Sequence, residues 1–135
     1  MYEFEVIGNI VGKQRPRVNM YTGNVYTPNN TKDYEEYIRQ CFFLKYPQNE
    51  MLFERVKIDI VAYLKIQSNI KKAEKEKMLK DEISPTKKPD IDNIAKVVLD
   101  AINKYVIHDD SQVTKISVEK KYAEEAKLVI KIEEY

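Results

Sequence analysis

Alternation of hydrophobic and polar residues predicts four main strands along the chain. Residues 2–6 alternate hydrophobic side chains with glutamate, which predicts a first strand over residues 2–11. Over residues 56–66 every even-numbered residue is hydrophobic, which predicts a long strand with one strongly buried face. The pattern returns around residues 116–118 and 128–132, with a connection near residues 123–125. A turn signal at residues 21–24 joins two short extended pieces, the second ending at Tyr26.

Hydrophobic residues spaced three and four apart predict two amphipathic helices. The first begins at cap candidates in residues 28–31 and ends before Pro47. Its expected buried face consists of Tyr34, Tyr37, Ile38, Cys41 and Phe42. The second runs over about residues 90–104, with a hydrophobic face of Ile91, Ile94, Ala95, Val98, Ala101, Ile102 and Tyr105. Residues 69–80 favour a third helix that is only weakly hydrophobic.

The order β-α-β-α-α-β-β predicts an α+β fold, with helices packed on a small mixed or mostly antiparallel sheet. A length of 135 residues, 43% of them hydrophobic, suits one domain over residues 1–135 with a single core. One cysteine and one histidine exclude an internal disulfide and a zinc site built from these two residue types. The sequence shows neither a signal peptide nor a membrane-spanning hydrophobic run, so we expect a cytoplasmic protein without a membrane partner.

The charge is close to balanced overall, at +1, but it is unevenly placed. Residues 65–88 contain eight lysines and four acidic residues, whereas residues 105–135 contain five lysines and seven acidic residues. This separation suits a protein that binds phosphates in one place and a cation in another. Taken alone, the basic run is better explained by a solvated Lys/Glu helix.

Acidic residues gather at the start of the second predicted helix. Asp92, Lys96 and Asp100 are four residues apart and form one polar ridge opposite the buried face. Asp90 precedes the first turn, where one carboxylate oxygen can cap the helix while the other stays free. Helix capping and a surface ion-pair ladder are the ordinary alternative for this pattern.

A second acidic pair, Asp109-Asp110, lies in the connection that follows this helix. The simplest interpretation of Asp109-Asp110-Ser111 is an ordinary turn, because these residue types are common in loops. If the connection folded back against Asp90 and Asp92, three or four carboxylates would form the oxygen-lined site that Mg²⁺ requires. Such a site supports phosphodiester hydrolysis, and the nearby Lys96 would add a proton source or a positive charge.

A basic segment near the N-terminus predicts contacts to a phosphate backbone. Lys13, Arg15 and Arg17 share one side of a chain held extended around Pro16. The preceding glycines do not form a Walker A loop, because their spacing is too short and Gln14 occupies the Ser/Thr position.

These pieces, in this order, resemble the RusA family of Holliday junction resolvases. The resemblance covers about residues 10–120 and is carried by K-Q-R-P-R, V-Y-T-P, P-D-I-D-N-I-A-K, L-D-A-I and D-D-S-Q-V. It implies a homodimeric, Mg²⁺-dependent endonuclease of host or phage origin, with Mn²⁺ as a possible substitute ion, that cuts four-way DNA junctions symmetrically. The implied catalytic residues are Asp90, Asp92, Lys96 and Asp110, with Asp109 as a further candidate metal ligand. The predicted DNA contacts are Lys13, Arg15, Arg17, Lys71, Lys72, Lys87 and Lys88.

The chain departs from the family pattern in two places, and two other functions stay open. The Lys-rich stretch before the motif is longer than in compact members, and Ile107-His108 replaces an aromatic-Leu pair, which affects the preferred cleavage sequence more than the metal site. The first alternative is a non-catalytic DNA-binding accessory protein of recombination with the same fold. A small-molecule phosphohydrolase is the second, and it would require an enclosed pocket.

Overall fold

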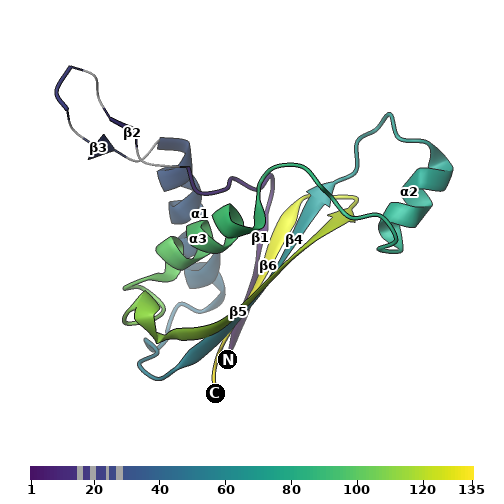
Figure 1. The fold of residues 1–135 in the computed structure, drawn as a ribbon. Helices are drawn as coiled ribbons and strands as arrows, with labels where there is room; N and C mark the ends of the chain where they lie inside the picture. The colour runs from purple at the N-terminus through teal and green to yellow at the C-terminus, as the bar shows by residue number, and fades with distance from the viewer. Residues whose placement is uncertain (15–16, 19–20, 24, 27–28) are drawn as a thin grey trace.

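The computed structural model describes residues 1–14, 17–18, 21–23, 25–26 and 29–135. Six strands and three helices follow one another along this part of the chain (Figure 1). In order, they are β1 (Tyr2–Ile7), β2 (Arg17–Val18), β3 (Val25–Tyr26), α1 (Asn29–Lys45), β4 (Val56–Lys65), α2 (Lys72–Leu79), α3 (Ile91–Ile102), β5 (Val113–Ala123) and β6 (Lys127–Glu134). A 3-10 turn, η1 (Asp110–Gln112), precedes β5.

A four-stranded mixed sheet in the order β1-β6-β4-β5 forms the centre of the fold and confirms the predicted α+β class. β4 runs parallel to β5 and antiparallel to β6, so these two consecutive strands lie on opposite sides of β4. β2 and β3 form a separate antiparallel pair, as the turn signal predicts. Among the described residues β5 pairs only with β4, which leaves its outer edge free.

The core lies between one face of the sheet and the helices α1 and α3, which cover that face (Figure 1). The predicted alternation in β4 is confirmed, because its even-numbered residues are all buried. From α1, Tyr34, Ile38 and Phe42 pack into this core, and Cys41 is half-buried beside them. Tyr37, expected in the same face, is 39% exposed and instead donates a hydrogen bond to the carbonyl of Ile7.

Two predicted elements end earlier than expected. β1 stops at Ile7, because Gly8 turns the chain with a φ of 116° and donates its N–H to the carbonyl of Ala126. α3 stops at Ile102, because Asn103 is extended and Lys104 has a φ of 69°. Tyr105 therefore lies outside the helix, and Ile91, in the first turn, is 49% exposed. The stretch of the expected helix that is buried in the core runs from Ile94 to Ile102.

α2 lies beyond one end of the sheet, away from α1 and α3 (Figure 1). Met78 is its only buried residue, and Lys75 pairs with Glu124 at 3.1 Å to hold it near the β5–β6 connection. Among the described helices, none is long and hydrophobic enough to cross a membrane.

Candidate active site

Asp90 places a carboxylate on the surface at the start of α3. It occupies the N-cap position with an extended backbone, but its side chain makes no capping hydrogen bond, contrary to the sequence prediction. Its Oδ2 atom instead lies 2.9 Å from the ammonium of Lys88, which competes for the oxygen that a cap would use. Half of the Asp90 side chain is exposed, so the carboxylate is accessible to a ligand.

The polar ridge of α3 is present, but it is not an ion-pair ladder. Asp92 and Lys96 are both exposed, and neither forms an ion pair with any described residue. Asp100, the third member, pairs with Lys13 at 2.9 Å. The ion-pair ladder that would have explained these charged residues structurally is therefore missing. The carboxylate of Asp92 and the ammonium of Lys96, four residues apart, are both open to solvent.

Residues 10–14, which we call the N-terminal strap, hold the start of α3 in place. The Lys13 backbone N–H donates to the carbonyl of Asn93 at 3.0 Å. Its ammonium lies between the carboxylates of Glu35, at 2.7 Å, and Asp100, at 2.9 Å. Burial acts to lower the pKa of Lys13, but its hydrogen bonds to both carboxylates outweigh burial and raise that pKa. The strap thus joins α1 to α3 through a charge that both helices share.

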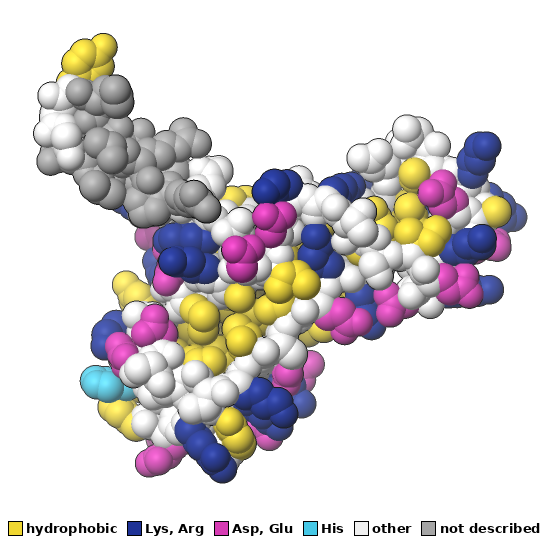
Figure 2. Space-filling model, viewed as in Figure 1, with side chains coloured by type: hydrophobic (Ala, Val, Ile, Leu, Met, Phe, Trp, Pro, Cys, Tyr) yellow, Lys and Arg dark blue, Asp and Glu magenta, His cyan; other side chains and the backbone are white. Residues whose placement is uncertain are grey.

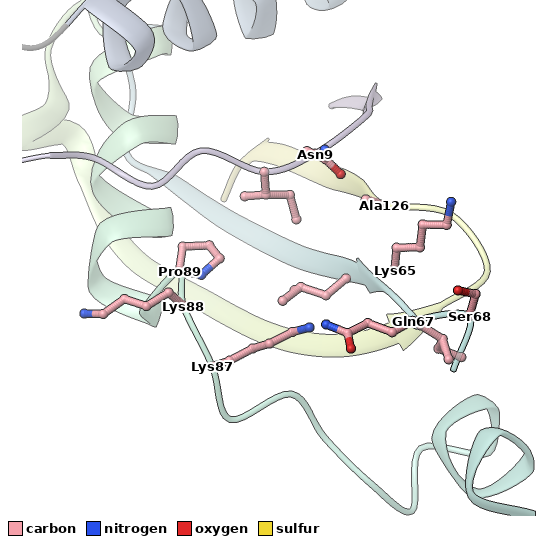
Figure 3. A pocket seen from close by; sticks show the side chains of 11 residues that line it. Asn9, Lys65, Gln67, Ser68, Lys87, Lys88, Pro89 and Ala126 are labelled. Carbon is pink, nitrogen blue, oxygen red and sulfur yellow. The ribbon is translucent and has the colours of Figure 1, made fainter. Parts of the chain in front are cut away.

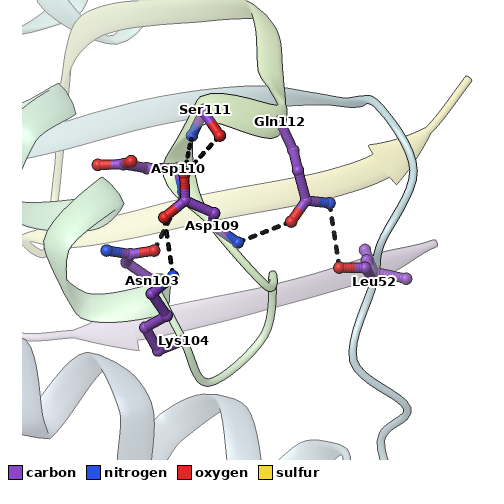
Figure 4. A network of polar contacts seen from close by, with 7 residues as sticks. All are labelled: Leu52, Asn103, Lys104, Asp109, Asp110, Ser111 and Gln112. Atoms are coloured by element: carbon purple, nitrogen blue, oxygen red, sulfur yellow. Dashed lines mark hydrogen bonds and ion pairs between the residues drawn. The ribbon is translucent and has the colours of Figure 1, made fainter.

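The second acidic pair is organised by its own turn at η1 (Figure 4). Asp109 accepts hydrogen bonds from the Ser111 backbone and hydroxyl, and its backbone N–H donates to Gln112 Oε1 at 2.7 Å in a capping box. Hydrogen bonds from Lys104 and Ser111 hold the pKa of the Asp109 carboxyl well below its usual range. These contacts engage Asp109 within the turn and leave the exposed Asp110 as the open carboxylate.

The two acidic pairs lie at opposite ends of α3. The backbone N–H of Asp110 donates to the side chain of Asn103, which caps the C-terminal end of the helix, whereas Asp90 precedes its N-terminal end. The 12 residues of α3 span about 18 Å at the rise of an α-helix. Among the described residues, no three potential ligands of the His, Cys, Asp and Glu types are grouped to hold a metal ion. The described part of one chain therefore does not bring Asp110 to Asp90 and Asp92.

The residues predicted to contact DNA fall into three groups. The Lys13 ammonium is engaged in the ion pairs of the strap. Arg15 and the side chain of Arg17 lie outside the described residues. Four further lysines are exposed, two at the start of α2 and two before α3; they are Lys71, Lys72, Lys87 and Lys88.

Sequence reasoning did not find the roles of Glu35 and Asn103. Glu35 contacts Lys13 from 22 positions away, and Asn103 fixes the backbone of Asp110 from beyond the end of α3. The spacing of hydrophobic residues along the sequence does not indicate such long-range contacts, so only the folded chain shows them.

α3 and β5 are in contact, and both carry hydrophobic residues that are not buried. We call four of these residues the α3–β5 margin: Ala95, Leu99, Ile116 and Val118. None of the four is buried, and Ile116 is 39% exposed. Figure 2 shows hydrophobic side chains gathered over these two elements, with charged side chains around them. The margin lies beside the free edge of β5.

Comparison with known proteins finds a family model and a relative that both match most of this chain. The family model described as "Endodeoxyribonuclease RusA" matches residues 8–133. A protein of Bacillus subtilis (strain 168), named "Uncharacterized protein YqaN", is 33% identical over 136 residues, which cover 98% of this chain and 95% of that protein. The match includes the strap, the start of α3 and η1.

Proposed function

The chain belongs to the RusA family of endodeoxyribonucleases, and we propose that it is a Mg²⁺-dependent enzyme that cuts four-way DNA junctions. Membership implies a Holliday junction resolvase, and nucleases of this family are generally Mg²⁺-dependent. The observation that supports catalysis is the pair Asp92 and Lys96, exposed and free of ion pairs with described residues at the start of α3. A protein that only binds DNA would gain nothing from carboxylates that face phosphate.

We further propose that the active site is completed by a second copy of the chain. Asp90 and Asp92 lie at one end of α3 and Asp110 at the other, so two antiparallel α3 helices would bring the two sets together at both ends. Two-fold symmetry would build two identical sites. Two such sites match the paired, symmetric cuts that resolution of a junction requires.

The α3–β5 margin and the free edge of β5 form the surface that we assign to this dimer. An unpaired strand edge offers N–H and C=O groups to a second strand. Leu99 is part of α3, and Ile116 lies on the face of the sheet that α3 covers, because it pairs with the buried Ile58. Both side chains would become buried in this dimer. Dimerisation through this surface would bury the α3–β5 margin and complete both sites in one step.

In such a site each residue has a distinct task. Asp90, Asp92 and Asp110 are the proposed ligands, with Asp109 as a further candidate that its turn already engages. A bound Mg²⁺, or Mn²⁺ in its place, would offset negative charge on the phosphate. Lys96 would place its ammonium beside the same phosphate, four residues from Asp92 and one helical turn away.

Basic residues of three segments would position the DNA. We propose that they contact backbone phosphates without reading sequence. The set comprises Arg15, Arg17, Lys71, Lys72, Lys87 and Lys88. We place the enzyme in the cytoplasm, where its DNA substrate is found.

The direct test is cleavage of a synthetic four-way junction in Mg²⁺, with linear duplex as the control substrate. Asp92→Asn should lower the cleavage rate by orders of magnitude and leave junction binding intact, because it removes a metal ligand and a charge that repels phosphate. The matched variant Asp33→Asn alters an exposed carboxylate of α1 and should cut normally. Junction binding without cleavage by the unaltered chain would favour the accessory protein instead.

Mixed dimers test the proposed shared site. A dimer of one Asp92→Asn chain and one Asp110→Asn chain would carry both substitutions in one site and keep the other site intact. Mixing the two inactive chains should therefore restore nicking of one strand. Mixing Asp90→Asn with Asp92→Asn should restore nothing, because each site would still lack one ligand. Equal failure of both mixtures would reject the shared site.

A further inference from the structure

A pocket of about 360 Å³ lies immediately before Asp90 (Figure 3). Four segments line it: the turn after β1, the C-terminal end of β4 with residues 66–68, the segment 87–89 that leads into α3, and Ala126 in the β5–β6 connection. The volume lies at the lower end of the range for small-ligand sites. The pocket therefore has room for a small group, and Pro89 in its lining directly precedes Asp90.

The pocket combines positive charge with a hydrophobic floor. Lys65 and Lys87 line it, and neither forms an ion pair with a described residue. Figure 3 shows Lys87 extending across the pocket toward Gln67, whereas Lys88 extends in the opposite direction. Leu64 and Ile66 provide hydrophobic surface on the Lys87 side of β4, whereas the Lys65 side chain points to the other face of the strand. A ligand with one anionic end and one flat, weakly polar body would match this lining.

A second hollow of about 330 Å³ continues from the first. The two share Ile10, Lys88 and Pro89, and the second extends along the strap to Gly12 and Asn93. A strand that followed both hollows would pass Lys88, which lines both of them and pairs with Asp90 at 2.9 Å. This continuity connects the pocket to the proposed site of cleavage.

We propose that the pocket binds one unpaired nucleotide of the strand to be cut, with its phosphate at Lys87 and its base over Leu64 and Ile66. Gln67 and Ser68 would supply hydrogen bonds to the base edge. This inference rests on the proposed function for the presence of DNA. Strands exchange at the centre of a junction, where the cost of removing one nucleotide from the stack is smallest. Binding that nucleotide would fix the neighbouring phosphate at Asp90 and Asp92.

The first test uses the wild-type chain and small probes, so it does not depend on nuclease activity. Thymidine 5′-monophosphate, thymidine and inorganic phosphate are each titrated while the backbone amide signals of Gln67 and Ser68 are followed by NMR. The nucleotide should shift these signals at concentrations where thymidine and phosphate do not. Lys87→Gln should weaken the response roughly tenfold, because it removes a charged donor to the phosphate. An equal response to phosphate alone, or no response to the nucleotide, overturns the proposal.

The second test uses a four-way junction that carries 2-aminopurine at the crossover, in EDTA so that nothing is cut. The fluorescence of this base rises when it leaves the stack. Binding of the wild-type chain should raise it, and Lys87→Gln should reduce the rise at saturating protein. Lys131→Gln removes the same charge from the opposite face of the sheet and should behave as wild type. If Lys87→Gln raised the fluorescence as much as wild type does, the pocket would not bind the nucleotide. If the wild-type chain did not bind the junction, the proposed function would be wrong, and the nucleotide titration alone would decide whether the pocket binds a nucleotide.

Discussion

Gly12 is a residue whose lack of a side chain has a direct structural reason. A Cβ atom there would lie 2.9 Å from the Cβ of Pro89 and 3.1 Å from the Cβ of Asn93, closer than such atoms pack. The strap can therefore approach the start of α3 only with glycine at this position. Through this contact Gly12 fixes the backbone on both sides of Asp90 without touching a substrate.

We expect Gly12→Ala to displace the strap from α3 and to impair cleavage more than junction binding. The added methyl group should force a shift of the strap that costs roughly 1–3 kcal/mol of stability. Thermal melting and single-turnover cleavage of the junction measure the two effects. Ala73→Ser adds one atom at an exposed position of α2 and serves as the control. Wild-type stability together with wild-type cleavage in Gly12→Ala would show that the strap does not position Asp90.

At the scale of single elements, the turn η1 depends on the ionised form of Asp109. Hydrogen bonds from Lys104 and Ser111 lower the pKa of Asp109 below its ordinary value of 3.8. Because the folded pKa is the lower one, this stabilisation is present in full above the unfolded pKa and is lost as the pH falls toward the folded pKa. Asp109→Asn should thus lower the melting temperature at about pH 6, and its difference from wild type should narrow toward about pH 3.

Removing Lys104, the ion-pair partner of Asp109, should have the same effect on the difference in melting temperature between variant and wild type. Lys104→Met deletes the largest contributor to the lowered pKa, so its melting temperature should approach that of wild type over the same pH range. A difference that stays constant from about pH 6 to about pH 3 in both variants would mean that ionised Asp109 does not hold the turn together.

Elements with a strong local period could be predicted from the sequence, and their ends could not. The alternation in β4 and the helical spacing in α1 and α3 report burial directly, because the core selects hydrophobic residues at those positions. The end of α3 depends instead on the backbone conformations of Asn103 and Lys104, which cannot be predicted from the spacing of hydrophobic residues. Strand order is equally hidden, since β4 separates two strands that are consecutive in the chain.

The candidate site could be predicted as a set of residues, but not as an arrangement. The sequence picks out Asp90, Asp92 and Asp110 by motif, whereas their separation along α3 follows from helix length and from the hydrogen bond between Asp110 and Asn103. The pairing of Lys13 with Glu35 and Asp100 likewise depends on where the strap crosses α3. Long-range contacts of this kind require the folded chain.

On the scale of the whole molecule, the two edges of the sheet differ in what they present. β1 and β5 form the two edges, and each carries an exposed isoleucine, Ile7 on β1 and Ile116 on β5. Only the β5 edge lies beside the α3–β5 margin, and β5 directly follows the turn that carries Asp110. If the dimer forms there, a charge on the β5 edge should prevent it, and a charge on the β1 edge should not.

We therefore expect Ile116→Glu to convert a dimer into a monomer and Ile7→Glu to leave the dimer intact. A buried, unpaired carboxylate at a two-fold axis would face its own copy, which adds charge repulsion to the cost of desolvation. Sedimentation measures the change as a fall from about 32 kDa to the 16.0 kDa of one chain. Because each proposed site needs two copies, Ile116→Glu should also lose cleavage, and circular dichroism should show that its fold is retained. If monomeric Ile116→Glu still cut both strands of a junction, each chain would contain a complete site, and the shared arrangement of Asp90, Asp92 and Asp110 would be wrong.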